Sequence, residues 1–345
     1  MEALRIGVLG AARISELAII GPAAATGTRL VAVAARDRDR AETFARNHGV
    51  ERVLDSYADV LADPEVEAIY NPLANSLHAP WNKAAILAGK HVLTEKPFAS
   101  NTTEAAQVRD LARGRSLVLF EGFHYLYHPL MRRLMSLLAD GELGTLRHVE
   151  STLFMSAPPA DDPRWSLELA GGALMDLGCY ALHAQRILGD FAGGEPTLIE
   201  AKGAERDGVA GVDAWADAYL EFPSGATGLA RCSMTSEHWD MSLRVIGTTG
   251  EAFIPDFLYQ KYDDRIIIET GSGERTEHCG HAASYTYQLE AFVEAVRHGT
   301  PYRTDADDAV ATMSLVDGCY RAIGLQPRPA YTGQLVATRQ GDTTP

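Results

Sequence analysis

Near its start the chain reads LRIGVLGAARIS at positions 4–15, an apolar run that passes through Gly7 and Gly10 into a helical pattern. Glycines at such a strand-to-helix turn let the backbone approach a pyrophosphate, which the N–H groups and dipole of the helix N-terminus attract. Leu9 and Ala12 stand where a strict G-x-G-x-x-G fingerprint has more glycine. The run predicts a dinucleotide-binding unit, and a tight turn without a ligand is the alternative.

The first 120 residues alternate short apolar runs with amphipathic stretches. Strands are expected at 4–9, 30–34, 68–71, 91–94 and 116–120. Helices are expected at 13–25, 37–48, 76–88 and 102–113. Short strands that alternate with helices of this length are typical of βαβ units in a parallel sheet. The pattern predicts an α/β fold whose first part, residues 1–123, is a doubly wound Rossmann domain.

A different pattern follows Glu121. Strands of alternating polarity are expected at 147–155, 198–203, 214–222, 227–235, 242–247 and 265–269. Helices are expected at 129–140, 172–188 and 305–322. Turn residues such as Pro223-Ser224-Gly225 separate the strands, which favours an antiparallel meander with helices against it. Residues 124–345 are therefore predicted to form an α+β domain with a large, mostly antiparallel open sheet.

Composition limits the classes of partner. The 31 Lys and Arg against 46 Asp and Glu give a net charge of −15, which repels nucleic-acid phosphates and anionic lipid. No apolar run reaches the ~20 residues of a membrane span and no secretory pattern follows Met1, so we expect a cytoplasmic protein. Cys179, Cys232, Cys279 and Cys319 lack metal-binding spacing, so we expect reduced thiols and no metal site.

The end of the second predicted strand bears on the choice of cofactor. It reads Ala35-Arg36-Asp37. A cofactor without a 2′-phosphate usually needs an acidic residue there for its ribose hydroxyls, whereas an arginine accommodates the phosphate. Because a guanidinium binds phosphate through two parallel hydrogen bonds, Arg36 favours NADP(H). Asp37 keeps NAD(H) as the alternative.

A charged pair, Glu95 and Lys96, directly follows the fourth predicted strand. Ligands of open α/β sheets bind outside the carboxyl ends of the strands, so we expect this pair in the crevice, with Lys96 near the nicotinamide. An ammonium group there can hydrogen-bond a substrate oxygen or lower the pKa of a neighbouring group. The alternative is an exposed pair of little energetic weight.

A second polar group lies in the helical pattern of residues 171–183. Asp176, Tyr180 and His183 are spaced as i, i+4 and i+7, which places them on one face of a helix. A carboxylate, a phenol and an imidazole together suit the orientation of a hydroxyl group and the transfer of its proton. The alternative is a buried hydrogen-bond network.

Three further side chains are candidates for the substrate side. Tyr125 belongs to an aromatic run that either lines the cleft or packs at the domain junction. Arg164 and Trp165 precede the polar helix, and such a pair is typical of surfaces on which sugars and cyclic diols stack. The expected substrate is a small polyol or sugar, with packing of this loop on the sheet as the alternative.

Four motifs occur together in one order along the chain. They are the turn at Gly7 to Ala12, the loop Asn71-Pro-Leu-Ala-Asn75-Ser-Leu-His78, Glu95-Lys96-Pro97, and Gly-Gly-x-x-x-Asp176-x-x-x-Tyr180. In this respect nearly the whole chain resembles the Gfo/Idh/MocA oxidoreductase family. It is most similar to the branch of dimeric dihydrodiol dehydrogenases, NADP-dependent xylose dehydrogenases and glucose-fructose oxidoreductases, which carry Tyr where inositol dehydrogenases carry His.

The resemblance implies roles for individual residues. Lys96 and Tyr180 would handle the proton, Asp176 would orient the substrate, and His183 would contact the substrate or compete as acid/base. The Lys96-Pro97 bond is expected to be cis. The cofactor would be bound by Gly7, Gly10, Ala11, Ala12, Arg13, Ile14, Arg36, Pro72, Leu73, Asn75, His78, Glu95 and Lys96.

The predicted function is NADP(H)-dependent hydride transfer to or from a carbinol or carbonyl carbon of a sugar, cyclitol or cyclic diol. The alternatives are an NAD-preferring inositol-type dehydrogenase that uses His183, and a non-catalytic NADP(H)-sensing regulator. A homodimer or homotetramer built on the second-domain sheet is also expected. We expect one face of that sheet to expose apolar residues such as Val149, Leu229 and Val245.

Overall fold

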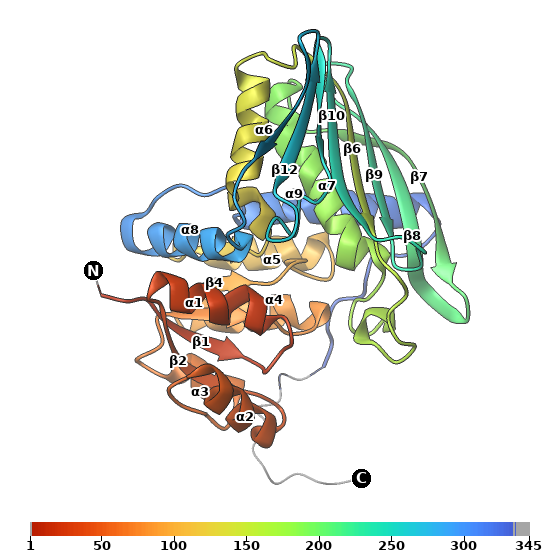
Figure 1. Cartoon of the computed structure of the whole chain (residues 1–345). Coiled ribbons are helices and arrows are strands. Elements are labelled where there is room, and N and C mark those ends of the chain that lie inside the picture. The colour runs from red at the N-terminus through yellow and green to blue at the C-terminus, as the bar shows by residue number, and fades with distance from the viewer. Residues whose placement is uncertain (1, 334, 336–345) are drawn as a thin grey trace. The chain divides into compact units, whose positions relative to one another are not determined.

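The first sheet is parallel throughout. A computed structural model of the chain describes residues 2–333 and 335. Within these residues the sheet has five strands in the order β2-β1-β3-β4-β5, of which β1, β2 and β4 are labelled in Figure 1. They are β1 (Arg5–Leu9), β2 (Arg29–Ala34), β3 (Ala68–Asn71), β4 (His91–Thr94) and β5 (Leu119–Glu121). Nearly every strand residue is buried, as is usual for parallel strands covered on both faces, and the α/β prediction for this part of the chain is confirmed.

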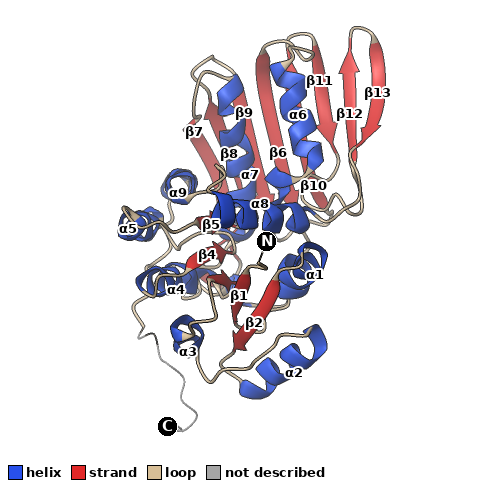
Figure 2. Ribbon diagram, turned by 90° about the vertical axis from the view of Figure 1, so that its left-hand side faces the viewer, coloured by secondary structure: helices blue, strands red, loops and turns tan. Residues whose placement is uncertain are grey.

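Helices flank this sheet, with α1 on one side and α4 on the other (Figure 2). They are α1 (Gly21–Thr26), α2 (Arg38–His48), α3 (Tyr57–Ala62), α4 (Asn75–Leu87) and α5 (Thr102–Ala112). A π-helical segment, η1 (Glu16–Ile20), precedes α1, so the helix predicted at 13–25 is two pieces. The sequence analysis did not predict α3, although Ser56 caps it by accepting the N–H of Asp59 at 3.1 Å.

The strand order reverses at β1, with β2 on one side of it and β3 on the other. In open α/β sheets ligands bind outside the carboxyl ends of the strands at such a reversal. Gly10 follows β1 and Leu73 follows β3, and a Cβ added to Gly10 would lie 3.1 Å from Cδ2 of Leu73. Two of the loops predicted to bind the cofactor are therefore adjacent at this point.

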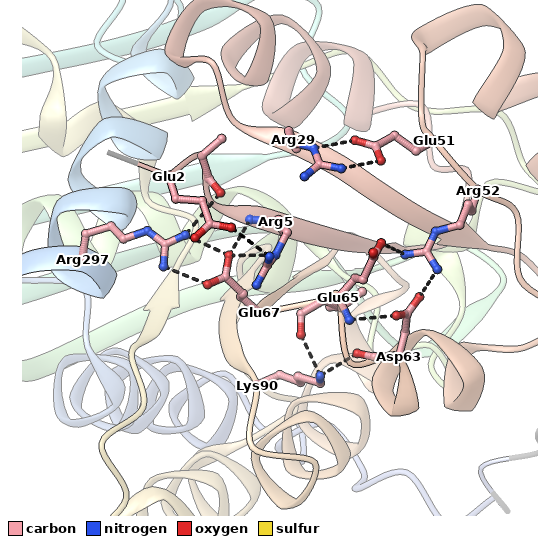
Figure 3. A network of polar contacts seen from close by, with 12 residues as sticks. Glu2, Arg5, Arg29, Glu51, Arg52, Asp63, Glu65, Glu67, Lys90 and Arg297 are labelled. Carbon is pink, nitrogen blue, oxygen red and sulfur yellow. Dashed lines mark hydrogen bonds and ion pairs between the residues drawn. The ribbon is translucent and has the colours of Figure 1, made fainter.

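Charged residues occupy the opposite edge, where the strands begin (Figure 3). Arg297 of α8 (Ser284–His298) binds Glu67, which precedes β3, at 2.8 Å. Arg29 at the start of β2 binds Glu51 at 2.7 Å. Lys90, which precedes β4, donates to the backbone carbonyls at positions 63 and 66 at 2.8 and 2.6 Å. Each of these cations is thus matched by an acceptor of the protein itself.

The second sheet is large and mostly antiparallel, as predicted. Its strands are β6 (Leu146–Phe154), β7 (Thr197–Arg206), β8 (Val209–Glu221), β9 (Thr227–Ser233), β10 (Asp240–Gly247), β11 (Gly250–Ile254), β12 (Arg265–Thr270) and β13 (Gly273–His278). Their order is β13-β12-β11-β10-β6-β9-β8-β7, and only β6 and β9 pair in parallel within the described residues. The prediction of six strands is wrong, because β11 and β13 were not expected. Strand β13 is an exposed edge strand of polar residues and shows no apolar alternation.

Helices cover one face of this sheet (Figure 2). Helix α7 (Cys179–Ile187), which continues the π-helical segment η4 (Leu174–Gly178), packs on β6 and β9. Helix α6 (Pro129–Ala139) packs on β12. We call the face covered by α7 the inner face and the opposite one the outer face.

The prediction that Val149, Leu229 and Val245 share an exposed face is wrong. Val149 and Val245 are paired in register and fully buried on the inner face. Leu229 pairs with Glu150, one position further along β6. Since successive strand residues point to opposite faces, Leu229 lies on the outer face.

The chain forms two compact units. The first contains residues 2–122 and 285–310 and the described residues from 330 onward, and the second contains 123–284 and 311–329. The predicted boundary at 123/124 adjoins the first change of unit, but the chain returns to the first unit through α8. Phe120 of β5 accounts for this return, because it packs against Phe292 and stacks on Tyr302 at 5.7 and 5.0 Å. Residues 336–345 of the predicted second domain lie outside the described residues.

Candidate active site

The turn after β1 depends on two glycines with different tasks. Gly10 has φ of 95°, which strongly favours glycine, and its N–H donates to the carbonyl of Ala34 at 2.7 Å. A Cβ on Gly7 would lie 2.5 Å from Cγ1 of Val60, so glycine here lets α3 approach β1. The predicted cofactor residues Ala11, Ala12, Arg13 and Ile14 follow, and all four are at least partly exposed. The helical segment begins at Glu16, directly after this turn, and the N–H groups of Leu17 and Ala18 donate to the carbonyl of Ile14 at 3.1 and 2.9 Å.

The arginines after β2 differ in their partners. Arg38 binds Glu42 at 3.0 Å, and Arg40 donates to the carbonyl of Ala11 at 3.1 Å. Arg36 is exposed, and its side chain has no hydrogen bond or ion pair within the described residues. Burial raises the pKa of Tyr57, and the nearby charge and backbone of Arg36 oppose this rise, so Tyr57 lies beside this loop although nothing in the sequence marked it.

Asp37, the residue that kept NAD(H) open, has a structural role. Its carboxylate caps α2 by accepting the N–H of Arg40 at 3.2 Å. Such a cap satisfies one of the free N–H groups of the first helical turn. The side chains of Asp37, Arg38 and Arg40 thus have hydrogen-bond partners within the protein, whereas that of Arg36 has none among the described residues.

His78 joins the loops after β3 and β4. Its Nδ1 lies 2.7 Å from the carbonyl oxygen of Pro97, and its Nε2 lies 2.8 Å from that of Leu73. Burial lowers the pKa of His78 to about 4, so at neutral pH one ring nitrogen carries the proton. A neutral ring can donate to only one of these two carbonyls, so His78 hydrogen-bonds one of the two loops and lies in close contact with the other. Pro72 is buried, and Asn75, at the first position of α4, is half-buried.

Lys96 lies between anchored neighbours. Glu95 is buried, its N–H donates to the carbonyl of Asn71 at 3.0 Å, and its carboxylate accepts from the hydroxyl of Tyr70 at 3.0 Å. Burial and the nearby Glu95 charge raise the pKa of Tyr70 well above its usual value, so that hydroxyl stays a donor. The Lys96-Pro97 bond is cis and Lys96 is half-buried. The backbone around this ammonium is thus fixed on both sides.

In the second unit, Asp176 is bound to a residue predicted to contact substrate. Nε of Arg164 lies 2.7 Å from Oδ2 of Asp176, and Asp162 binds the same guanidinium at 3.4 Å. The charge of Asp176 is the largest cause that raises the pKa of Arg164. The Arg164 side chain keeps 40% of its surface exposed, against 16% for Asp176. The pair therefore presents a carboxyl group and a partly accessible guanidinium side by side.

Tyr180 lies in an aromatic cluster with Phe123, His124 and Tyr125, whose ring centroids are 5.3, 5.8 and 6.0 Å from its own. His183, its predicted competitor, stacks on Phe123 at 3.9 Å, and its Nδ1 lies 2.6 Å from the hydroxyl of Tyr125. His183 has no exposed surface, whereas Tyr180 keeps 5%. Tyr125 is also fully buried, so its hydroxyl serves His183 within the cluster.

Trp165 is packed rather than open. Its indole N–H donates to the carbonyl of Pro158 at 3.3 Å, and the guanidinium of Arg206 covers its ring at 4.3 Å. Only 4% of Trp165 is exposed. Its role as a stacking surface for the substrate stays a prediction.

The predicted site residues belong to both units. Lys96 and the cofactor loops are part of the first unit, and Asp176, Tyr180 and Arg164 are part of the second. Within the first unit the structure brings together Gly10 with Leu73 and His78 with Pro97. Within the second it brings together Asp176 with Arg164 and Tyr125 with His183.

The described residues lack two further features. They contain no group of three or more His, Cys, Asp or Glu side chains that could hold a metal ion. None of their helices combines the length and the apolar character that crossing a bilayer demands.

Two family models match the chain. The model described as "Oxidoreductase family, NAD-binding Rossmann fold" matches residues 4–123. The model described as "GFO/IDH/MocA C-terminal domain" matches residues 131–253.

Individual relatives span most of the chain. A D-xylose 1-dehydrogenase (NADP(+)) from Haloferax volcanii is 35% identical over 92% of this chain and 97% of its own. A trans-1,2-dihydrobenzene-1,2-diol dehydrogenase from Sus scrofa is 36% identical over 74% of this chain and 75% of its own. A solved 3-ketoreductase from Actinomadura kijaniata, in complex with NADP and TDP-benzene, has a TM-score of 0.84 at 29% identity, covering 93% of this chain and 98% of that one.

Proposed function

Because this chain belongs to the Gfo/Idh/MocA family of oxidoreductases, with its NAD-binding Rossmann domain, we propose hydride transfer between NADP(H) and a carbinol or carbonyl carbon of a sugar, cyclitol or cyclic diol. The chain is a nicotinamide dinucleotide-binding oxidoreductase by its family. The xylose and dihydrodiol dehydrogenases among its relatives support a small polyol as the substrate class.

The residues of the first unit fit a dinucleotide. The positive φ of Gly10 leaves the turn without a Cβ where a pyrophosphate must approach the backbone. Arg36 supports NADP(H), because its exposed guanidinium has no partner within the described residues and can bind a 2′-phosphate bidentately. When bound, the nicotinamide supplies the hydride acceptor for oxidation and the hydride donor for reduction.

We assign the proton transfer to Tyr180 and Lys96. In the oxidative direction Tyr180 acts as the phenolate and takes the proton of the substrate hydroxyl, and in reduction the resulting phenol returns that proton. Lys96 hydrogen-bonds the reacting oxygen and stabilises negative charge that develops on it. The observation that carries the choice of Tyr180 is the complete burial of His183, whose Nδ1 is already engaged by Tyr125.

Asp176 orients the substrate as a carboxylate. The Arg164 guanidinium at 2.7 Å favours the ionised form, which accepts hydrogen bonds from substrate hydroxyls. The partly exposed guanidinium offers donors to a second substrate oxygen beside them. A carboxylate next to a guanidinium suits a substrate with neighbouring hydroxyl or carbonyl oxygens.

Replacing Tyr180 by Phe tests the assignment. We expect kcat to fall by ~10²- to 10⁴-fold, the usual contribution of positioned proton transfer, while the Kd for NADPH stays unchanged. Tyr262→Phe, the same change at an exposed tyrosine between β11 and β12, is the matched control and keeps its kcat. If Tyr180→Phe retained nearly full turnover, the assignment would be wrong, and His183 would be the next residue to replace.

We also propose that the protein is a homodimer or homotetramer joined through the outer face of the large sheet. Partly exposed apolar side chains lie on that face, namely Phe154, Trp215, Tyr219, Leu229 and Phe253. Apolar patches of this kind commonly mark association surfaces. Sedimentation should show an oligomer for the wild type and a shift toward monomer for Leu229→Glu. A wild type that sediments as a monomer would contradict the proposal.

A further inference from the structure

A buried ion pair lies beside the glycine pair that precedes the polar helix. It joins Asp213 of β8 to Arg328, and neither side chain has any exposed surface. Nε and Nη1 of Arg328 donate to the carbonyls of Gly171 and Gly211, both at 2.6 Å. All of these residues belong to the second unit. Arg328 therefore ties a segment near the end of the described chain to the residues just before η4.

Asp213 holds the other side of the same turn. Its Oδ2 accepts the N–H of Leu174, the first residue of η4, at 2.6 Å. Its Oδ1 accepts from Arg328 and from the hydroxyl of Tyr320, the latter at 3.0 Å. The ring of Tyr320 also lies under the Arg328 guanidinium, 4.1 Å from its carbon. The carboxylate is thus surrounded by three donors, one of which is the backbone that starts the helix.

Gly172 lies between these two attachments. Its φ is 125°, and a Cβ there would collide with the Asp213 carboxylate and the Arg328 guanidinium. Its carbonyl accepts the N–H of Asp176 at 3.0 Å. The attachments at 171 and 174 therefore flank the residue whose carbonyl sets the position of the Asp176 backbone. The segment they hold is a π-helical turn, a geometry that is rare and frequent at functional sites.

A contribution to stability alone does not account for this arrangement. Burying two charges has a large desolvation cost, and well-packed apolar side chains often stabilise a protein as well or better. The ion pair instead fixes the relative positions of three separate segments, because four of its hydrogen bonds join it to defined backbone or hydroxyl atoms of those segments. We propose that Asp213 and Arg328 are positioning residues that set the geometry of the π turn and so the relation of Asp176 to Tyr180. This inference rests on the proposed function of those two side chains.

The test uses graded substitutions and a matched control. Arg328→Lys keeps the charge but loses the fork of donors, and Tyr320→Phe removes one hydrogen bond to Asp213 while keeping the ring. The control, Glu195→Gln, breaks the 2.7 Å ion pair of Arg186, a buried arginine near the other end of α7. We expect Arg328→Lys to lower kcat by about 10- to 100-fold at unchanged KM for NADPH, because small misplacements of reacting groups have effects of this size. Tyr320→Phe should lower kcat less, and Glu195→Gln should leave it unchanged.

Hydrogen exchange separates positioning from general stability. Amides at positions 171–180 should exchange faster in Arg328→Lys while the rest of the second unit keeps its protection, and the control should show no such local change. Unchanged kcat and unchanged local exchange in folded Arg328→Lys would overturn the inference, and so would faster exchange spread evenly over the chain. If the wild type reduces or oxidises no polyol or carbonyl substrate, the proposed function fails, and the exchange pattern still decides whether the ion pair holds the turn.

Discussion

Charged side chains at the two ends of the parallel strands differ in whether they have partners within the protein. Where the strands begin, Glu67 and Glu51 bind Arg297 and Arg29, and Lys90 donates to two carbonyls (Figure 3). Where the strands end, the exposed Arg36 has no side-chain partner among the described residues. Both edges carry cations on the same strands. The difference supports the proposal that residues at the carboxyl ends of the strands bind the cofactor, whereas the charges at the amino ends stabilise the fold.

The largest effect on turnover is expected at β4, which has a lysine just before its start and another just after its end. Lys96→Met should lower kcat by ~10²- to 10⁴-fold with little change in Tm, because it removes the cation assigned to the reacting oxygen. Lys90→Met is the matched control. It leaves two buried carbonyls without their donor, so it should lower the free energy of unfolding by about 1–3 kcal/mol without changing kcat.

The two lysine variants distinguish a role in the reaction from a role in the stability of the fold. Steady-state kinetics and thermal unfolding of both variants give the answer. If Lys90→Met lost turnover as strongly as Lys96→Met while remaining folded, the division of labour between the two edges would be wrong.

A smaller effect is expected at β2, which has an arginine at its start and another just beyond its end. Arg36→Ala should lower kcat/KM for NADPH by about 10- to 100-fold, since charge-assisted bidentate contacts to phosphate are lost, and should leave kcat/KM for NADH unchanged. Arg29→Ala, which breaks only the exposed pair with Glu51, should change neither value. An equal loss with both cofactors would contradict the assignment of Arg36 to the 2′-phosphate.

The smallest effect concerns Glu67, at the edge where the strands begin, and the pH dependence of the free energy of unfolding. Hydrogen bonding by Arg297, aided by the Arg5 N–H and both positive charges, lowers the pKa of Glu67. A carboxylate with a lowered folded-state pKa adds stability above its unfolded pKa and loses it as the pH falls through the folded value. The free energy of unfolding of the wild type should exceed that of Glu67→Gln by up to about 1 kcal/mol at pH 7, and the difference should shrink in acid. A difference that grew in acid would contradict the paired state of Glu67.

The sequence predicted the elements whose side-chain pattern is local. The strands at 68–71 and 91–94 match β3 and β4, because short apolar runs bounded by polar residues mark buried parallel strands. The prediction of Gly10, Asp176 and Tyr180 as site residues has a related basis, since each lies at a fixed offset from its neighbours, and their roles stay predictions. Helix α8 also had such a signal that was overlooked, with buried Tyr285, Leu289 and Phe292 at helical spacing.

Other features depend on tertiary contacts that no local pattern encodes. The π turns at 16–20 and 174–178 interrupt a 3.6-residue period that the sequence continues. The face of Val149 and Val245 was predicted wrongly because the strand register, which decides it, is set by distant partners. Arg328 carries no sequence signal at all, since its partner Asp213 is 115 residues away.

The return of the chain through α8 affects how the first unit can form during synthesis. Phe120 at the edge of the parallel sheet is covered by Phe292 and Tyr302, and Glu67 meets its cation in Arg297. A nascent chain that has reached only residue 284 lacks all three. The parallel sheet therefore completes its core only after residues 123–284 of the second unit have been translated, although its own strands precede them in the chain. A fragment that ends at the first domain boundary would expose the Phe120 ring on the edge strand of the parallel sheet. We therefore expect the first unit to fold stably only in a chain that includes α8 and the residues up to 310.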